Sequence, residues 1–173
     1  WITRESASKR SKLKQVKLSQ IASRKEAKLS AAGKSLDFKP FEDSTIINDD
    51  SKRRMLYLTF PFKNLPIPQL LYSTERDGRS IRAMHKLIDD IGITTVIVRR
   101  GNLVFGGFAA AKWTNEGVAF GEGTSTFLFQ LSKDAFLPYK PQEEDACMLY
   151  GGRDMISFGR KDLVLDNDFN NCS

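Results

Sequence analysis

The sequence predicts an α+β fold that is mainly β: a two-layer antiparallel β-sandwich with a few flanking helices and a basic N-terminal arm. Three observations predict it. About six short apolar or β-branched segments are separated by turns at intervals of roughly 10–20 residues. Only one segment, after Ser80, has clear helical periodicity. Strands and helices do not alternate regularly, which argues against a doubly wound parallel sheet.

Size and charge define the domain organisation. The 173 residues, 40% of them hydrophobic, suit one domain with an appendage. Residues 1–35 carry ten Lys/Arg and two acidic residues, hence +8, whereas residues 36–173 carry 17 and 19, hence −2. We expect residues 1–52 to form a basic arm and an acidic linker, extended or helical on a partner, and residues 53–173 to form the domain.

Composition also limits the classes of protein. No run approaches the roughly 20 apolar residues of a membrane span. The 2 cysteines are too few for a disulfide scaffold, and the 1 histidine excludes a histidine-rich zinc site. A cytoplasmic location is therefore expected.

Before the helix, two apolar segments are expected to enter the core. Residues 55–62 read as a short helix or strand that runs into an extended, proline-rich connection. Residues 70–73 read as a buried strand, and Asp77-Gly78 as the turn that follows it.

The predicted helix begins after Ser80, a plausible N-cap. Ile81, Met84, Ile88 and Ile91 then recur at spacings of 3, 4 and 3, which places them on one helical face. We expect Gly92 to end the helix as a left-handed C-cap residue.

A β-hairpin follows the helix. Residues 94–98 are β-branched, residues 100–102 supply a turn, and residues 103–109 return as the second strand. Gly106 and Gly107 in a strand interior are costly unless close packing or a bulge requires them.

The remaining strands are short. Residues 127–131 form a strand with Phe127, Phe129 and Leu131 on one side. Three more are expected at residues 147–150, 155–158 and 163–165. Together they complete a sheet-on-sheet core.

The glycines and carboxylates after residue 120 do not complete a binding motif. Gly121 and Gly123 lead into a strand and lack the Lys-Ser/Thr of a phosphate-binding loop, so a turn is expected. Asp162, Asp166 and Asp168 lack the central glycine and distal glutamate of a calcium loop. A solvated or partner-facing loop is the expected role.

His85 and Cys147 are the two candidate catalytic residues. His85 can pair with Asp89 four residues on, but no nucleophile is placed for it, so a surface or half-buried histidine is expected. An enzyme acting on oxidants would need Cys147, and the acidic residues 143–145 before it disfavour a thiolate. We therefore expect no enzyme, no cofactor and no metal.

The basic arm is the first candidate binding element. It lacks interleaved aromatic residues, which disfavours nucleic acid, and its apolar face is thin for a lipid surface. A solvated tail and a tether on an acidic assembly such as a microtubule both remain open. The candidate contact residues are Lys9, Arg10, Lys12, Lys14, Lys17, Arg24, Lys25 and Lys28.

From about residue 60 to residue 173 the sequence resembles a TLDc domain. The blocks that carry the resemblance, in order, are Leu70-Leu71-Tyr72-Ser73, Asp77-Gly78, Ser80, Val104-Phe105-Gly106-Gly107-Phe108-Ala109, Trp113, Gly121, Gly123, Phe127-Leu128-Phe129, Phe158-Gly159, Leu165-Asp166-Asn167-Asp168-Phe169 and Cys172. Two features depart from the family. Pro68-Gln69 stand where the family usually has a tryptophan, and the family's closing Glu-x-Trp strand does not occur before Ser173. That strand either lies outside the given sequence or is supplied by something else, and a domain without it would expose a sheet edge.

The resemblance implies a β-sandwich of the kind found in oxidation-resistance proteins, with no established active site. It implies a non-enzymatic module that docks on a large complex such as the vacuolar-type proton ATPase, at the cytosolic face of acidic organelles. The alternative is a structural component of a ciliary or microtubule assembly, tethered by the arm. The candidate interface residues on the domain are Glu75, Asp77, Asp166 and Asp168.

Overall fold

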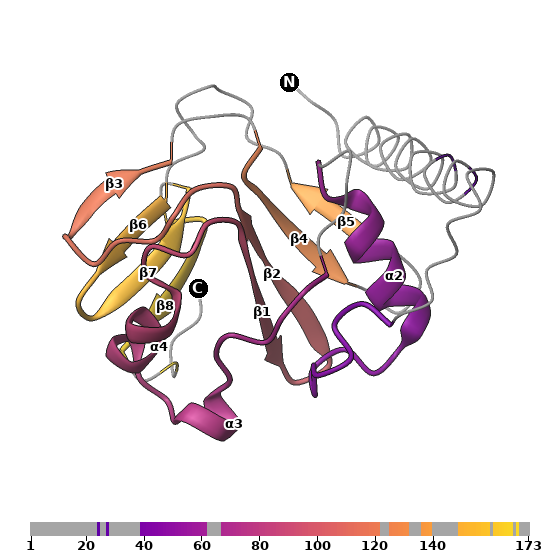
Figure 1. The fold of residues 1–173 in the computed structure, drawn as a ribbon, viewed down its shortest axis with the longest axis horizontal. Coiled ribbons are helices and arrows are strands. Elements are labelled where there is room, and N and C mark those ends of the chain that lie inside the picture. The colour runs from indigo at the N-terminus through magenta and orange to yellow at the C-terminus, as the bar shows by residue number, and fades with distance from the viewer. Residues whose placement is uncertain are drawn as a thin grey trace, which may run out of the picture. The chain divides into compact units, whose positions relative to one another are not determined.

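The fold is that of a computed structural model, drawn in Figure 1. It describes residues 24, 27, 39–61, 67–121, 125–131, 149–159, 161–167 and 169, and the backbone of residues 136–139. The chain divides into two compact units, Trp1–Gln69 with Leu131–Leu137, and Leu70–Gln130 with Pro138–Ser173. The predicted boundary at residues 52 and 53 stays a prediction.

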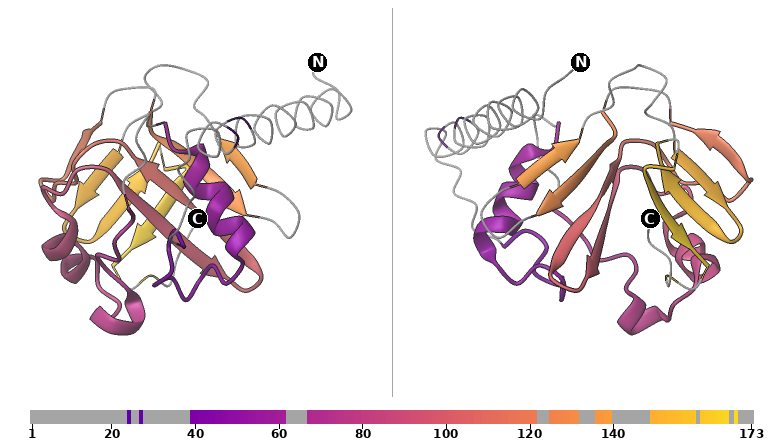
Figure 2. Two further views of the ribbon diagram at one scale, coloured as in Figure 1. Left: turned by 45° about the vertical axis from the view of Figure 1, so that its right-hand side comes forward. Right: turned by 180° about the vertical axis from the view of Figure 1, so that it is seen from behind.

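Two four-stranded antiparallel sheets dominate the described residues, which confirms the predicted fold class (Figures 1 and 2). The first sheet has the order β1-β2-β4-β5, with β1 at Thr94–Arg100, β2 at Leu103–Ala109, β4 at Phe127–Leu131 and β5 at Phe136–Tyr139. The second has the order β3-β6-β7-β8, with β3 at Val118–Phe120, β6 at Leu149–Gly152, β7 at Met155–Phe158 and β8 at Leu163–Asp166.

The first unit contains helix α2, Asp50–Thr59. Asp49 caps it, because its carboxylate accepts hydrogen bonds from the backbone N–H groups of Ser51 at 2.8 Å and Lys52 at 3.1 Å. The helix buries Leu56, Tyr57 and Leu58. The segment predicted as a short helix or strand at residues 55–62 is therefore a helix, and it begins at Asp50. Residues 62–66 lie outside the described residues.

Helix α4, Ile81–Ile88, begins as predicted, with the Ser80 hydroxyl accepting from Ala83 N at 3.3 Å. The predicted end at Gly92 is wrong. Asp89 is the C-cap, Asp90 takes the left-handed conformation with φ 61°, and Ile91 is 39% exposed. The chain leaves the helix early because Asp90 N donates to Trp113 O at 3.2 Å, which ties this segment to the sandwich.

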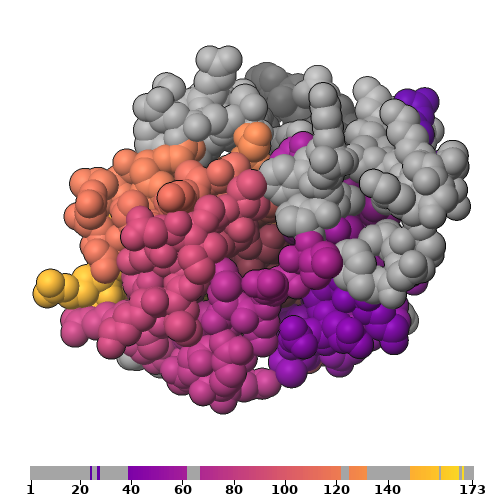
Figure 3. Space-filling view, viewed as in Figure 1, coloured from indigo at the N-terminus to yellow at the C-terminus, as the bar shows by residue number. Residues whose placement is uncertain are grey.

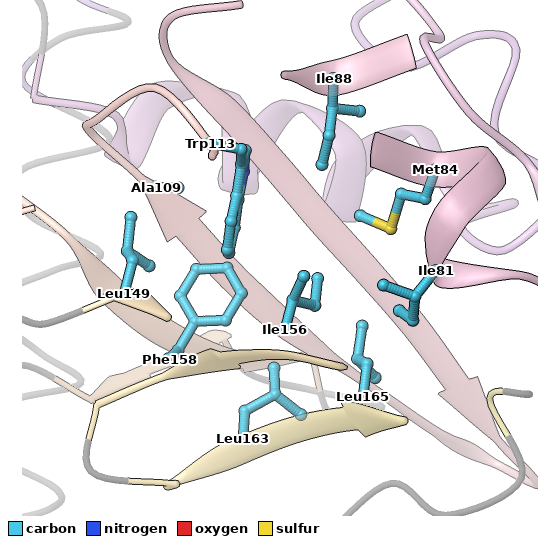
Figure 4. Close-up of a cluster of buried hydrophobic side chains, with 10 residues drawn as sticks. All are labelled: Ile81, Met84, Ile88, Ala109, Trp113, Leu149, Ile156, Phe158, Leu163 and Leu165. Atoms are coloured by element: carbon cyan, nitrogen blue, oxygen red, sulfur yellow. The ribbon is translucent and has the colours of Figure 1, made fainter. Parts of the chain in front are cut away.

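The core of the second unit lies between the two sheets and α4 (Figure 4). Strands β7 and β8 supply Ile156, Phe158, Leu163 and Leu165, while α4 supplies Ile81, Met84 and Ile88. Trp113 completes the cluster. It is fully buried, and its indole N–H donates to Thr94 Oγ1 at 2.8 Å while its ring packs edge-on against Phe120 and Phe158.

The paired glycines of β2 are explained by close packing on both faces of the strand. A Cβ on Gly107 would lie 2.4 Å from Phe158 Cε1, and one on Gly106 would lie 1.9 Å from the Val96 carbonyl oxygen. Only glycine therefore allows the Phe158 ring to rest on β2 at Gly107. The predicted hairpin is confirmed, with β1 paired antiparallel to β2. Strand β1 extends two residues beyond the predicted end, so Arg100, predicted in the turn, pairs with Leu103.

Several other strand predictions need correction. Residues 70–73 are not a strand. Leu70 is 40% exposed, and the segment leads into a single helical turn, α3, at Thr74–Asp77. The strand predicted at 147–150 is observed from Leu149 to Gly152, and its first two residues lie outside the described residues. Strands β3 and β5 were not predicted. The strands at 127–131, 155–158 and 163–165 are confirmed, the last extending to Asp166.

Candidate functional site

The segment before α4 is held together by polar contacts rather than by burial. Ser73 caps α3 by accepting from Glu75 N at 3.3 Å, and Ser73 N donates back to Asp77 Oδ2 at 2.9 Å. None of the four residues of α3 is buried. This turn is therefore a surface element whose shape depends on its hydrogen bonds.

Arg76 is the centre of that network. Its guanidinium donates to both carboxylate oxygens of Asp77 at 2.9 Å and to the Leu71 carbonyl oxygen at 2.7 Å. The Arg76 hydrogen bond, followed by that from Ser73 N, holds the pKa of Asp77 below its ordinary value. The Asp77 carboxylate is thus occupied by hydrogen bonds within the turn. Glu75 is exposed and has no ion-pair partner among the described residues.

Tyr72 connects this turn to the end of β8. Its hydroxyl contacts the Gly78 carbonyl and accepts from Ser80 N at 3.3 Å, and burial is the main cause that raises the pKa of this phenol. The Tyr72 ring stacks on that of Phe169, with centroids 6.0 Å apart. Nearby, Ile81 N donates to Asn167 O at 3.3 Å.

The two acidic segments predicted as an interface therefore lie close together. We call this surface the Tyr72 face, defined as residues 71–78, 166, 167 and 169. Glu75 is its exposed carboxylate, Asp77 is half-buried and paired, and Asp166 is half-buried at the end of β8. Asp168 lies outside the described residues.

The basic arm is described only at Arg24 and Ala27, which are helical and exposed. The other candidate residues of the arm, Lys9, Arg10, Lys12, Lys14, Lys17, Lys25 and Lys28, lie outside the described residues. Their role as contact residues stays a prediction.

His85 forms the predicted pair with Asp89, with Nδ1 and Oδ1 2.6 Å apart. The expected surface or half-buried position is wrong, because His85 is only 3% exposed. Its Nε2 is buried without a hydrogen-bond partner in the described part of the chain. The imidazole lies on the side of α4 that faces Gly151 of β6. A Cβ atom added at Gly151 would lie 3.4 Å from His85 Cε1. The pair joins the last turn of α4 to its C-cap.

The remaining site candidates are placed as follows. Gly121 follows β3 with φ 81°, which fits a turn, and residues 122–124 lie outside the described residues. Cys147 and Cys172 are likewise outside the described residues.

Among the residues that are described, no three His, Cys, Asp or Glu side chains gather as metal ligands. None of the described helices is long and apolar enough to cross a membrane.

A basic surface on α4 was missed by the sequence reasoning. Arg82 and Lys86 are exposed one turn apart, and Arg82 Nη2 lies 3.1 Å from Asp154 Oδ1 in the β6–β7 turn, where Arg153 is also exposed. The spacing of Arg82 and Lys86 was available in the sequence. Their proximity to Arg153 was not, because it depends on the packing of α4 beside the second sheet.

Comparison with known families gives a match to the TLDc domain over residues 41–173. Neither the curated proteins nor the solved structures gave a match. The family match covers most of the chain, and it includes Tyr72, the paired glycines of β2 and the end of β8. The chain therefore belongs to the TLDc domain family.

Proposed function

We propose that this chain is a non-enzymatic protein-interaction module of TLDc type that docks through its Tyr72 face on a large complex such as the vacuolar-type proton ATPase. The observation that carries the proposal is the convergence of the two acidic segments through Tyr72, Phe169 and the Ile81–Asn167 hydrogen bond. A binding surface needs a fixed shape, and these contacts supply one to a segment that has little buried side-chain area.

The charge of the face supports a protein partner. Asp77 is neutralised within the turn by Arg76, which leaves Glu75 as the carboxylate that a basic surface of the partner can reach. Leu70, 40% exposed, lies next to this face in the sequence and offers apolar contact area. A polar rim beside aliphatic side chains is typical of protein interfaces. The choice of the proton ATPase rests on the family resemblance alone.

The test is a pull-down of purified vacuolar-type proton ATPase on the immobilised full chain at low and at physiological salt. Glu75→Lys should reduce the retained ATPase about tenfold, because a like charge then faces the partner. Glu116→Lys is the matched control, since Glu116 is an exposed glutamate in the loop between β2 and β3. Failure to retain the ATPase at either salt, or equal loss in both variants, contradicts the proposal.

A second candidate function is a structural component of a ciliary or microtubule assembly. The charge of +8 within residues 1–35 favours it, because an arm of this charge binds acidic surfaces without a folded pocket. Co-sedimentation with microtubules should be lost when residues 1–35 are deleted, and should weaken as salt rises above about 0.15 M. Sedimentation that is insensitive to the deletion or to salt counts against this function.

A further inference from the structure

The outer side of α4 is a second charged surface, formed by residues other than those of the Tyr72 face. We call it the α4 ridge, defined by Arg79, Arg82, Lys86, Leu87, Ile91 and Arg153. All six side chains are exposed. Four of them are cations, namely Arg79, Arg82, Lys86 and Arg153. The exposed acids beside them in the sequence are Asp90 and Asp154, so the net charge of this surface is 4 − 2 = +2. The second unit, residues 70–130 and 138–173, carries 11 Lys/Arg and 13 acidic residues, hence −2, so this surface is opposite in sign to the unit that bears it.

The parts of the ridge lie side by side. The ion pair between Arg82 Nη2 and Asp154 Oδ1, at 3.1 Å, fixes the β6–β7 turn against α4. At the left edge of Figure 3, the yellow surface of the chain after about residue 149 adjoins the rose surface below it. Arg82 and Lys86 are spaced by four residues on α4, so both project from one side of the helix.

Stability does not explain these side chains. Both partners of the Arg82–Asp154 pair are about 60% exposed, and ion pairs of that kind contribute only about 0–1 kcal/mol. Leu87 and Ile91, 40% and 39% exposed, leave apolar area in water next to the cations. Helix α4 is anchored by Ile81, Met84 and Ile88 on its other side.

We propose that the α4 ridge binds an acidic peptide segment that carries aliphatic side chains. The carboxylates would pair with Arg82, Lys86 and Arg153, and the aliphatic groups would cover Leu87 and Ile91. A nucleic-acid strand fits less well, because the large exposed hydrophobic residues of the described chain are all aliphatic and offer no ring for base stacking. A lipid surface fits less well too, because α4 already commits its broad apolar side to the core.

The test uses the full chain with all ten Lys and Arg residues of positions 1–35 changed to Gln, so that the arm does not compete for the probe. The probe is a fluorescein-labelled peptide of alternating Asp and Glu with two leucines four residues apart, followed by fluorescence anisotropy. Lys86→Glu should weaken binding about tenfold. Lys112→Glu, the same change at an exposed lysine outside the ridge, should change it less than about twofold.

Two further measurements separate the charge contribution from the apolar one. Asp154→Asn should strengthen binding about two- to threefold, because Arg82 is then free to meet the peptide. Replacing both leucines of the probe by serine should weaken binding about fivefold. Backbone amide NMR shifts on titration should centre on residues 82–91 and 153, with folding of each variant checked by circular dichroism.

Three outcomes overturn the inference: equal affinity of Lys86→Glu and Lys112→Glu, amide shifts centred elsewhere, or binding to phosphatidylserine vesicles without binding to the peptide. The experiment is independent of the ATPase pull-down. Glu75→Lys should leave peptide binding unchanged, and failure of the ridge does not alter the proposal for the Tyr72 face.

Discussion

The contact of β2 with β7 and the Tyr72 face represent two ways of fixing a backbone. At Gly107 the strand is placed by steric fit, because the Phe158 ring occupies the volume that a side chain would need. At residues 71–78 no residue is fully buried, and the backbone is held by bonds from Arg76, Asp77, Ser73 and Tyr72. The comparison indicates that the first region determines stability and that the second determines the shape of a surface.

The largest loss in the free energy of unfolding should come from removing the Phe158 ring, which packs between the two sheets. Phe158→Ala should lower the free energy of unfolding by about 3–5 kcal/mol, because Phe158 is 1% exposed and packs on both Trp113 and Gly107. Urea unfolding followed by tryptophan fluorescence measures it. Leu103→Ala, at a residue 52% exposed, should cost less than about 0.5 kcal/mol. Comparable losses in the two variants contradict the placement of the core.

Adding a side-chain atom at the contact between Gly107 and Phe158 should cause the next largest loss in the free energy of unfolding. Gly107→Ala should cost about 1–3 kcal/mol, because its Cβ would lie 2.4–2.6 Å from the Phe158 ring. The cost should fall when Phe158→Leu is also present, since the two residues share one space. Gly92→Ala is the control, because nothing lies within 4 Å of its Cβ position. An additive double mutant would show that Gly107 acts through its backbone conformation instead.

A change in the Tyr72 face should lower the free energy of unfolding by less than the two changes at the sheet-to-sheet contact. Tyr72→Phe removes the oxygen that accepts from Ser80 N but leaves the ring on Phe169. It should cost about 0.5–1.5 kcal/mol in urea unfolding. Tyr150→Phe removes a hydroxyl for which the described structure shows no hydrogen bond, so its cost should be smaller. An equal cost for the two changes would show that the Tyr72 hydroxyl does not hold the turn.

The steric region was largely predictable from the sequence. The strand at residues 127–131 follows from the sequence because burial imposes a period of two on its side chains, with Phe127, Phe129 and Leu131 buried in turn. The hairpin follows from its β-branched residues and its turn, since burial does not alternate along β1 or β2. The paired glycines indicated either close packing or a bulge. The structure shows close packing at Gly107.

The polar region was less predictable. Leu70 and Leu71 gave an apolar run that favoured a strand, but no strand pairs with it, and the carbonyl of Leu71 is taken by Arg76 instead. The stacking of Tyr72 on Phe169 joins residues 97 positions apart in the sequence (169 − 72 = 97). Local patterns carry no information on such a contact, so the sequence identified the acidic segments as separate candidates without placing them together.

The smallest effect is a pH dependence of the Tyr72 face. The folded-state pKa of Asp77 lies below its ordinary value of 3.8, first because of the Arg76 hydrogen bond. A depressed carboxyl pKa contributes stability that is present above the unfolded value and is lost as pH falls through the folded value. The stability difference between the chain and Asp77→Asn, measured by urea unfolding from pH 7 downward, should therefore shrink below about pH 4. A difference that stays constant across the acid range would show that Arg76 and Ser73 orient this turn without the charge of Asp77, and would make the Tyr72 face resemble the steric region more than the polar one.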